Sequence, residues 1–173
     1  HIDGDAFVNT VDPTYLVDAE GDYRYRSMVI VGVRATLSPS SPFPSGVNWW
    51  YFPNDYAFTR LTDYAFTPQD FDAETVLTFE YPCFLSDERW SQSEGWFTKR
   101  VRAFLASQGI EGTVHEVVLR RVPRAYPLPV QDDIDAFESL NATLSAYDNM
   151  YNLGRVSTYR YIWIKDIVEE AIS

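Results

Sequence analysis

The sequence predicts an α+β fold, a mixed and largely antiparallel sheet with flanking helices. Strand-like runs follow one another with short turns between them, which favours antiparallel pairing over repeated strand–helix–strand units. Two longer stretches carry apolar residues at helical spacing. Of the 173 residues, 46% are hydrophobic, so the chain can bury a core of its own.

Four runs predict the strands of the first half. Residues 6–10 are a short apolar run, and "YRYRSMVIVGVRATL" is apolar on both faces at its centre, as a central strand is. A proline-rich turn segment, "SPSSPFPSG", follows. Beyond it, "DYAFTRLTDYAF" and "AETVLTFEYPC" alternate apolar with polar residues, as half-exposed strands do.

The first long helix is predicted over 91–108. Ser91 and Glu94 are spaced as a capping box at its start, and Gly109 would end it. Its apolar residues, Phe104 among them, recur on one face. We therefore expect this helix to flank the sheet.

The last third combines a strand, two helices and a turn. A strand is expected over 114–122 and a helix over 131–147, whose first turn holds three aspartates at the positive end of the helix dipole. A short strand, "NMYNLG", and a terminal helix from about residue 163 complete the chain. We expect residues 1–125 to form a sheet domain and residues 126–173 a strand–helix segment.

The composition argues against several classes of partner. The formal net charge is −11 and the pI is near 4.5, so the chain would repel nucleic acid and an anionic membrane surface. No apolar stretch approaches the ~18 residues of a membrane helix, and no export signal is visible, so we expect a cytoplasmic protein. Because Cys83 is the only cysteine and there are only two histidines, neither a disulfide nor a metal site is expected.

The segment "GRVSTYRY" is unusual in so acidic a chain. Gly154 allows a tight turn after a strand, and the N–H groups at the start of the next helix can bind an anion. Arg155 adds a permanent positive charge in a planar fork. Tyr159 and Tyr161 would point the same way if the segment is extended. These residues predict an anion site, but Arg155 could equally pair with a surface carboxylate while the tyrosines pack.

Two further groups are candidates for ligand contacts. "RRVPRAYPLP" concentrates positive charge, and its prolines hold Tyr126 at the end of a strand, although the arginines could simply protect a strand edge. "VNWWYFPN" places Trp49, Trp50 and Tyr51 in a row, of which one face could line an aromatic cleft while the other packs in the core. Neither group supplies a general base, and the sequence has no phosphate-binding glycine loop and no nucleophile elbow.

Taken together, these motifs resemble the superfamily of FAD-dependent amine oxidases and protoporphyrinogen oxidases, and most closely the UDP-galactopyranose mutase-like flavoproteins. "AYP", with Tyr126, and "GRVSTYRYIWIKD" carry the resemblance at the spacing that those proteins show. "DAFVNTVDP", "YRYRSMVIVGV" and "TVLTFEYPC" extend it more loosely. The chain departs from those proteins at Trp163, where they carry an acidic residue, and at "IK", where they carry "MD".

The resemblance implies a site and a cofactor. It implies that Tyr126, Arg155 and Tyr161 contact a small-molecule substrate, with a sugar nucleotide as one candidate, and that Gly154 and Arg155 lie near FAD. It also implies that residues 6–10 close a flavin domain whose dinucleotide-binding start is missing from this sequence. We therefore expect the C-terminal portion of a longer FAD-dependent oxidoreductase or mutase. The isolated chain should be inactive, should bind FAD weakly or not at all, and should tend to form homo-oligomers.

Two other functions stay open. The aromatic residues and prolines could form a binding or interaction module without a cofactor, for a sugar nucleotide or a partner chain. The chain could also be a structural domain in which the arginines and tyrosines only pack.

Overall fold

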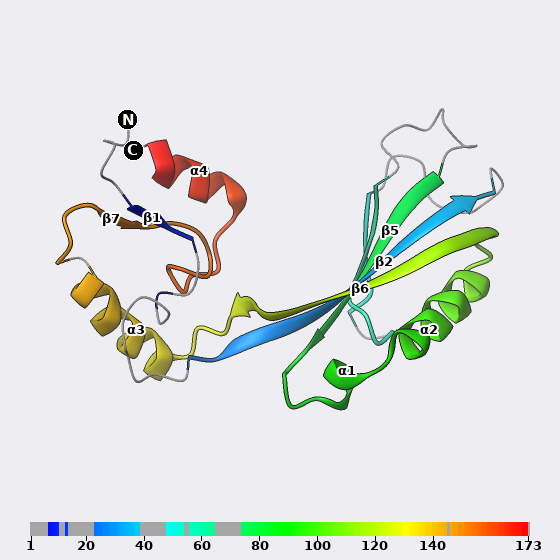
Figure 1. Cartoon of the computed structure of the whole chain (residues 1–173), viewed down its shortest axis with the longest axis horizontal. Helices are drawn as coiled ribbons and strands as arrows, with labels where there is room; N and C mark the ends of the chain where they lie inside the picture. Colours follow the sequence, from blue (N-terminus) through cyan, green and yellow to red (C-terminus); the bar gives the residue numbers. More distant parts are fainter. Residues whose placement is uncertain are drawn as a thin grey trace. The chain divides into compact units, whose positions relative to one another are not determined.

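The computed structural model describes residues 7–10, 13, 23–38, 48–53, 56–64, 74–144 and 146–172. Figure 1 shows its elements, which divide into two compact units. The first unit joins His1–Arg26 to Arg124–Ser173, and the second is Ser27–Pro123. Most of the proline-rich segment expected as a turn lies outside the described residues. The functional division between residues 1–125 and 126–173 stays a prediction.

A five-stranded antiparallel sheet forms the frame of the second unit, in the order β3-β4-β5-β2-β6. The strands are β2 (Tyr25–Leu37), β3 (Trp49–Tyr51), β4 (Arg60–Asp63), β5 (Glu74–Cys83) and β6 (Gly112–Pro127). Neighbours from β3 to β2 pair antiparallel. β6 also runs antiparallel to β2, because Ser27 Oγ donates to the carbonyl of Pro123 (2.7 Å) while Gly32 lies against the carbonyl of Val118.

β2 lies between β5 and β6 in this sheet. Val29, Val31, Val33 and Ala35 alternate along it and are fully buried, because side chains two apart point to the same face. The opposite face is less covered than the apolar sequence predicts, since Ile30 is only half-buried. β2 therefore has one closed face and one partly open face.

The predicted long helix is present as α2 (Glu94–Ser107). Its N-cap is Ser93, whose Oγ accepts a hydrogen bond from a backbone N–H of the first turn (3.3 Å). Gly109 ends the helix with φ +65°, and the backbone N–H of Ile110 donates to the carbonyl of Leu105 (2.9 Å). This is the Schellman motif, in which glycine is favoured because left-handed backbone strains other residues.

The capping box predicted at Ser91 is wrong. Ser91 ends a separate short helix, α1 (Glu88–Ser91), and Gln92 is extended with ψ 146°. The carbonyl oxygens of Trp90 and Gln92 accept hydrogen bonds from the Arg121 guanidinium (2.7 and 2.6 Å). A continuous helix would need these carbonyls for its own hydrogen bonds, so the helix stops here and restarts at the next serine.

The core of the second unit is mainly aromatic. Phe104 of α2 lies edge-on to Phe52, Phe58 and Phe79, with ring centroids 5.4, 4.9 and 5.8 Å away. Edge-to-face pairs of this kind stabilise beyond the area that they bury. Much of the aromatic content of the chain is thus used to pack α2 against the sheet, beside which it runs in Figure 1.

Residues from both ends of the sequence form the first unit. Its elements are β1 (Phe7–Asn9), α3 (Gln131–Leu144), β7 (Met150–Asn152) and α4 (Ile164–Ile172). β1 and β7 pair parallel, and a small core contains Phe137, Leu140, Leu144 and Tyr159. With the antiparallel sheet of the second unit, these elements confirm the predicted α+β class. No helix in the described part of the chain is long and apolar enough to cross a membrane.

Replacing Phe104 with alanine should lower the free energy of unfolding by about 3–5 kcal/mol, because it leaves a cavity among buried rings. Phe104 is only 3% exposed. Urea unfolding followed by circular dichroism measures the change. Arg102→Ala, at an exposed position of the same helix, is the matched control and should stay within about 0.5 kcal/mol of the wild type. Equal stabilities of the two variants would contradict this packing.

Candidate functional site

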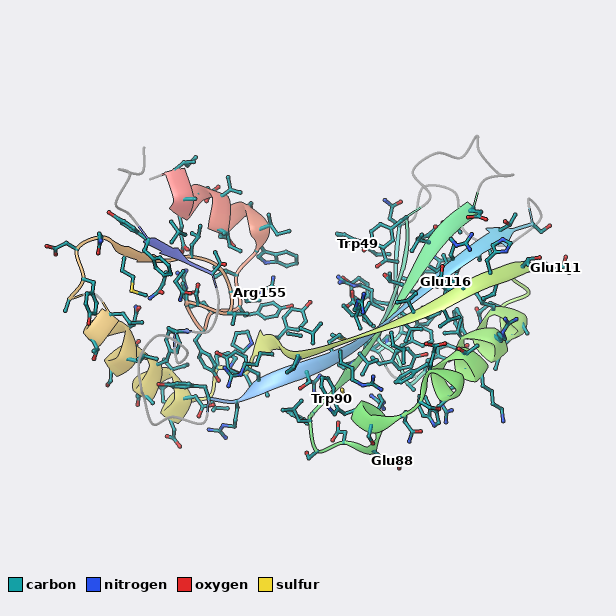
Figure 2. All side chains as sticks on the ribbon, in the orientation of Figure 1. Trp49, Glu88, Trp90, Glu111, Glu116 and Arg155 are labelled. Carbon is teal, nitrogen blue, oxygen red and sulfur yellow. The ribbon has the colours of Figure 1, made fainter. Side chains whose placement is uncertain are left out.

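Three of the predicted site residues come together in the first unit. Tyr126 is the next-to-last residue of β6, and Arg155, labelled in Figure 2, lies with Tyr161 in the segment between β7 and α4. The Cζ atom of Arg155 is 4.9 Å from the ring centroid of each tyrosine, and the two centroids are 5.6 Å apart. The guanidinium and the two rings therefore form a triangle, which we call the Arg155 cluster.

One edge of the Arg155 guanidinium is already occupied. Its Nε and Nη2 donate to the carbonyl oxygen of Ile162 at 3.1 and 2.7 Å. No carboxylate in the described part of the chain forms an ion pair with Arg155, so the alternative of a surface ion pair finds no support there. Because arginine stays protonated, its remaining N–H groups can bind an anion.

The chain reverses after Arg155 through a single helical turn. Gly154 precedes it with φ +97°, and Tyr159 closes it with φ +51°. The backbone N–H of Arg160 donates to the carbonyl of Arg155 (3.2 Å), and that of Tyr159 donates to the carbonyl of Val156 (3.4 Å). These two bonds define a Schellman motif, here with tyrosine at the position that glycine usually holds.

The expectation that Tyr159 and Tyr161 point the same way is wrong. It assumed an extended segment, whereas the backbone at Tyr159 is left-handed. As a result Tyr159 is 3% exposed and Tyr161 is 61% exposed. Of the two tyrosines, Tyr161 alone presents its ring to solvent beside Arg155.

The terminal helix does not begin at the glycine turn. α4 begins at Ile164, and the carboxylate of Asp166 accepts a hydrogen bond from the backbone N–H of Trp163 (2.9 Å). Lys165 lies 2.8 Å from the same carboxylate and lowers the Asp166 pKa by hydrogen bonding. The acidic residue at the start of α4 is thus Asp166, three positions after Trp163.

A buried polar network holds Tyr159. Its hydroxyl oxygen lies 2.7 Å from the Arg24 carbonyl, 2.9 Å from the Leu128 carbonyl and 3.1 Å from Asp133 Oδ2. Asp133 also accepts two hydrogen bonds from the Arg24 side chain (2.8 Å each) and one from its backbone N–H (3.1 Å). Burial, and then the Asp133 carboxylate, raise the Tyr159 pKa. The Tyr159 hydroxyl therefore stays protonated and donates its hydrogen bond to an acceptor within the protein.

Sequence reasoning missed several residues that build this region. It assigns the aspartates of α3 to the helix dipole and misses that Asp133 binds Arg24. It also misses a row of asparagines, in which Asn9 Nδ2 donates to Asn152 Oδ1 (3.0 Å) and Asn152 Nδ2 donates to Asn141 Oδ1 (2.9 Å). A polar residue inside the apolar run at 6–10 was the available signal, because buried amides need partners. The row fastens β1 and β7 to α3 just before the glycine turn.

The aromatic row of β3 lies in the second unit. Trp49, labelled in Figure 2, and Tyr51 are 58% and 65% exposed, whereas Trp50 packs against the core, as alternation along a strand predicts. Arg60 places its Cζ 5.8 Å from the Trp49 ring and its Nη1 3.5 Å from the Tyr51 hydroxyl, and it pairs with Glu80. Trp49 and Tyr51 are therefore the members of the row that a ligand could reach.

The basic segment before Tyr126 is used mainly in packing. Arg121 binds backbone carbonyls near α1, and the Cζ of Arg124 lies 5.3 Å from the Tyr25 ring centroid. β6 comes last in the sheet order of the described residues. The interpretation of these arginines as protection for a strand edge is thus consistent with the sheet.

Comparison with known proteins identifies the fold. No protein-family pattern matches the sequence, and no curated protein matches it. Among solved structures, a reduced UDP-galactopyranose mutase is similar, with a TM-score of 0.69 and 18% identity over 91% of this chain. The chain shares that fold. A protein from Exiguobacterium assigned as a protoporphyrinogen oxidase is also similar, with a TM-score of 0.57 and 17% identity over 85% of this chain.

These similarities confirm the resemblance at the level of fold. The chain spans only 37% and 35% of the lengths of those two proteins.

The free energy of unfolding should depend on pH through Asp133, whose pKa is lowered mainly by the hydrogen bonds from Arg24. A carboxyl group with a lowered folded-state pKa contributes full stability above the ordinary aspartate pKa of about 4, and loses it as the pH falls through the folded value. Asp133→Asn should therefore be less stable than the wild type at pH 7, and the difference should shrink in acid. Urea unfolding at several pH values measures it.

The control for this experiment is Asp132→Asn, which removes an exposed carboxylate from the same turn of α3. It should produce no comparable loss at pH 7. A gap between wild type and Asp133→Asn that keeps its full size well below pH 4 would contradict the role of this carboxylate.

Proposed function

We propose that this chain is the substrate-binding portion of an FAD-dependent oxidoreductase or mutase. The observation that carries the proposal is the Arg155 cluster, a permanent positive charge with no carboxylate partner among the described residues and with two tyrosine rings beside it. In this proposal Tyr126, Arg155 and Tyr161 bind an anionic group of the substrate, such as the diphosphate of a sugar nucleotide.

Fold and motif both support the proposal. The similar solved structures include a UDP-galactopyranose mutase, and the fold match covers most of this chain. "AYP" and "GRVSTYRY" contribute the three residues of the Arg155 cluster, although they lie far apart in the sequence. The two motifs meet in space around one permanent charge, as a shared ligand site would require.

The edge of Arg155 that forms no hydrogen bond within the described part of the chain suits a phosphate. Nε and one Nη2 hydrogen are taken by Ile162, which leaves the end-on edge formed by Nη1 and the second Nη2 hydrogen. This edge can make two parallel hydrogen bonds to one phosphate group. The hydroxyl of Tyr161, on a largely exposed side chain, can add a third donor.

Gly154, directly before Arg155, has a backbone that a cofactor could approach closely. A Cβ atom added there would meet nothing within 4 Å, and its φ of +97° favours glycine. The backbone is therefore open enough for a flat ring to come close. FAD, when bound, would supply the redox or nucleophilic chemistry, and this chain would bind and orient the substrate.

We also propose that a FAD-binding domain of the same protein covers α4 and the β1–β7 pair. Ile164, Val168 and Ile172 repeat along α4 and are 77%, 53% and 80% exposed. Phe7 and Tyr151, on the paired strands, are 53% and 56% exposed. Parallel strands normally belong to larger sheets that are covered on both faces. In an isolated chain the same apolar residues would favour homo-oligomers.

A second candidate is a binding module without a cofactor. The exposed Trp49 and Tyr51, with Arg60 between them, form an aromatic surface that could hold a sugar ring or a partner chain. This candidate needs neither the Arg155 cluster nor a flavin.

Purified full-length protein is expected to show the visible absorbance of bound flavin, because the proposed chemistry belongs to FAD. An absorbance spectrum before and after denaturation measures the released cofactor. A colourless full-length protein that still binds a sugar nucleotide would favour the module without a cofactor.

Arg155→Ala should weaken the binding of inorganic pyrophosphate by about 1.5–3 kcal/mol, the range for hydrogen bonds to charged groups. Isothermal titration calorimetry measures the affinity. Arg160→Ala is a matched control, since it removes the same charge from the same turn but from an exposed pair with Glu170 (2.6 Å). Losses of equal size in the two variants would mean that pyrophosphate responds to overall charge and not to this site.

A further inference from the structure

The left-handed turn before α4 assigns a role to Tyr159 that its motif did not reveal. We propose that Tyr159 is a positioning residue, whose side chain pins the turn that brings Arg155 and Tyr161 to the same place. The inference rests on the proposed function, in which the Arg155 cluster binds an anion. It replaces the expectation that Tyr159 touches the substrate, because its hydroxyl is engaged within the protein.

The described part of the chain contains the same motif twice, with different residues at the position that takes the left-handed conformation. α2 ends with Gly109 in left-handed backbone, and the turn after Arg155 ends with Tyr159 in left-handed backbone. Glycine adopts this conformation at little cost, whereas a residue with a bulky side chain is strained by it. A tyrosine at this position persists only if its side chain gains more than the backbone loses.

The side chain of Tyr159 makes such contacts. Its ring stacks on Phe137 of α3, with centroids 5.3 Å apart, and is 3% exposed. Its hydroxyl reaches acceptors on Arg24, Leu128 and Asp133, which belong to the segment before β2, the segment after β6, and α3. One side chain thus ties the turn to three separate parts of the first unit.

The position of Arg155 depends on the same turn. Arg155 is the residue whose carbonyl accepts the closing bond from Arg160, and its guanidinium binds the carbonyl of Ile162 after the turn. Tyr161 lies between those two points. If the turn opens, nothing in it holds the Arg155 guanidinium close to the Ile162 carbonyl and the Tyr161 ring. None of these groups touches the Tyr159 hydroxyl, so its effect on them would be indirect.

Three variants of the full chain test this role. Tyr159→Phe keeps the ring and removes only the hydroxyl. Tyr159→Gly relieves the backbone strain but removes the whole side chain. Leu140→Ala is the control, because Leu140 is 6% exposed in the same core but belongs to α3 and not to the turn.

Two measurements are made below the unfolding temperature of every variant. The first is the affinity for inorganic pyrophosphate by calorimetry. The second is the hydrogen-exchange rate of the Arg155 Nε–H by NMR, which reports the bond to Ile162 without any ligand. A residue that only stabilises the fold would change the melting temperature and leave both readouts unchanged.

We expect Tyr159→Phe to weaken pyrophosphate binding about tenfold, or about 1.4 kcal/mol, and to speed Arg155 Nε–H exchange. Tyr159→Gly should weaken binding at least as much, although its backbone suits the turn better. Leu140→Ala should lower the melting temperature and leave both readouts at wild-type values. An unchanged exchange rate in Tyr159→Phe overturns the inference, whatever the affinity.

Failure of the proposed function would look different. In that case Arg155→Ala would bind pyrophosphate as well as the wild type does, or neither would bind it. The exchange rate of the Arg155 Nε–H would still rise in Tyr159→Phe. That outcome removes the anion site and leaves Tyr159 as the residue that positions Arg155.

Discussion

The carboxylate of Asp133 is the group on which the first unit depends. It accepts hydrogen bonds from the side chain and backbone of Arg24, and it lies within reach of the Tyr159 hydroxyl. A largely buried charge is tolerated only when such partners satisfy it, because an unpaired one is costly. The segment before β2, the start of α3 and the turn before α4 are thus joined by hydrogen bonds to one group.

The partners of the other arginines show how the Arg155 cluster differs from an ordinary surface ion pair. With 25 acidic against 14 basic residues, carboxylates outnumber the basic side chains that could pair with them. Arg24, Arg34, Arg60 and Arg160 each pair with one of them. Arg121 and Arg155 instead bind neutral backbone carbonyls, and Arg155 also lies beside two tyrosine rings. A carbonyl fixes the guanidinium without cancelling its charge, which leaves that charge available to a ligand.

How far the sequence could predict these features depends on how local their causes are. Strands, the aromatic core helix and the glycine at its end follow from periodicity and from one residue's backbone preference, so they were predictable. The start of α2 was not, because Arg121 breaks the helix from 29 positions away. The left-handed turn was not either, since nothing local marks Tyr159 as a substitute for glycine. The motifs located the Arg155 cluster, but the orientation of its two C-terminal tyrosines needed tertiary contacts.

The pairing of β1 with β7 gives the chain an order of assembly. Asn9 and Asn152 meet across 143 positions, and the whole second unit lies between them. Closing so long a loop is slow and entropically unfavourable unless something shortens it. The second unit can do so, since it has its own core and a hydrogen bond joins Ser27 to Pro123 at its two ends. During synthesis β1 would leave the ribosome before β7, and it would stay without its partner strand until Ser27–Pro123 had been made and could fold.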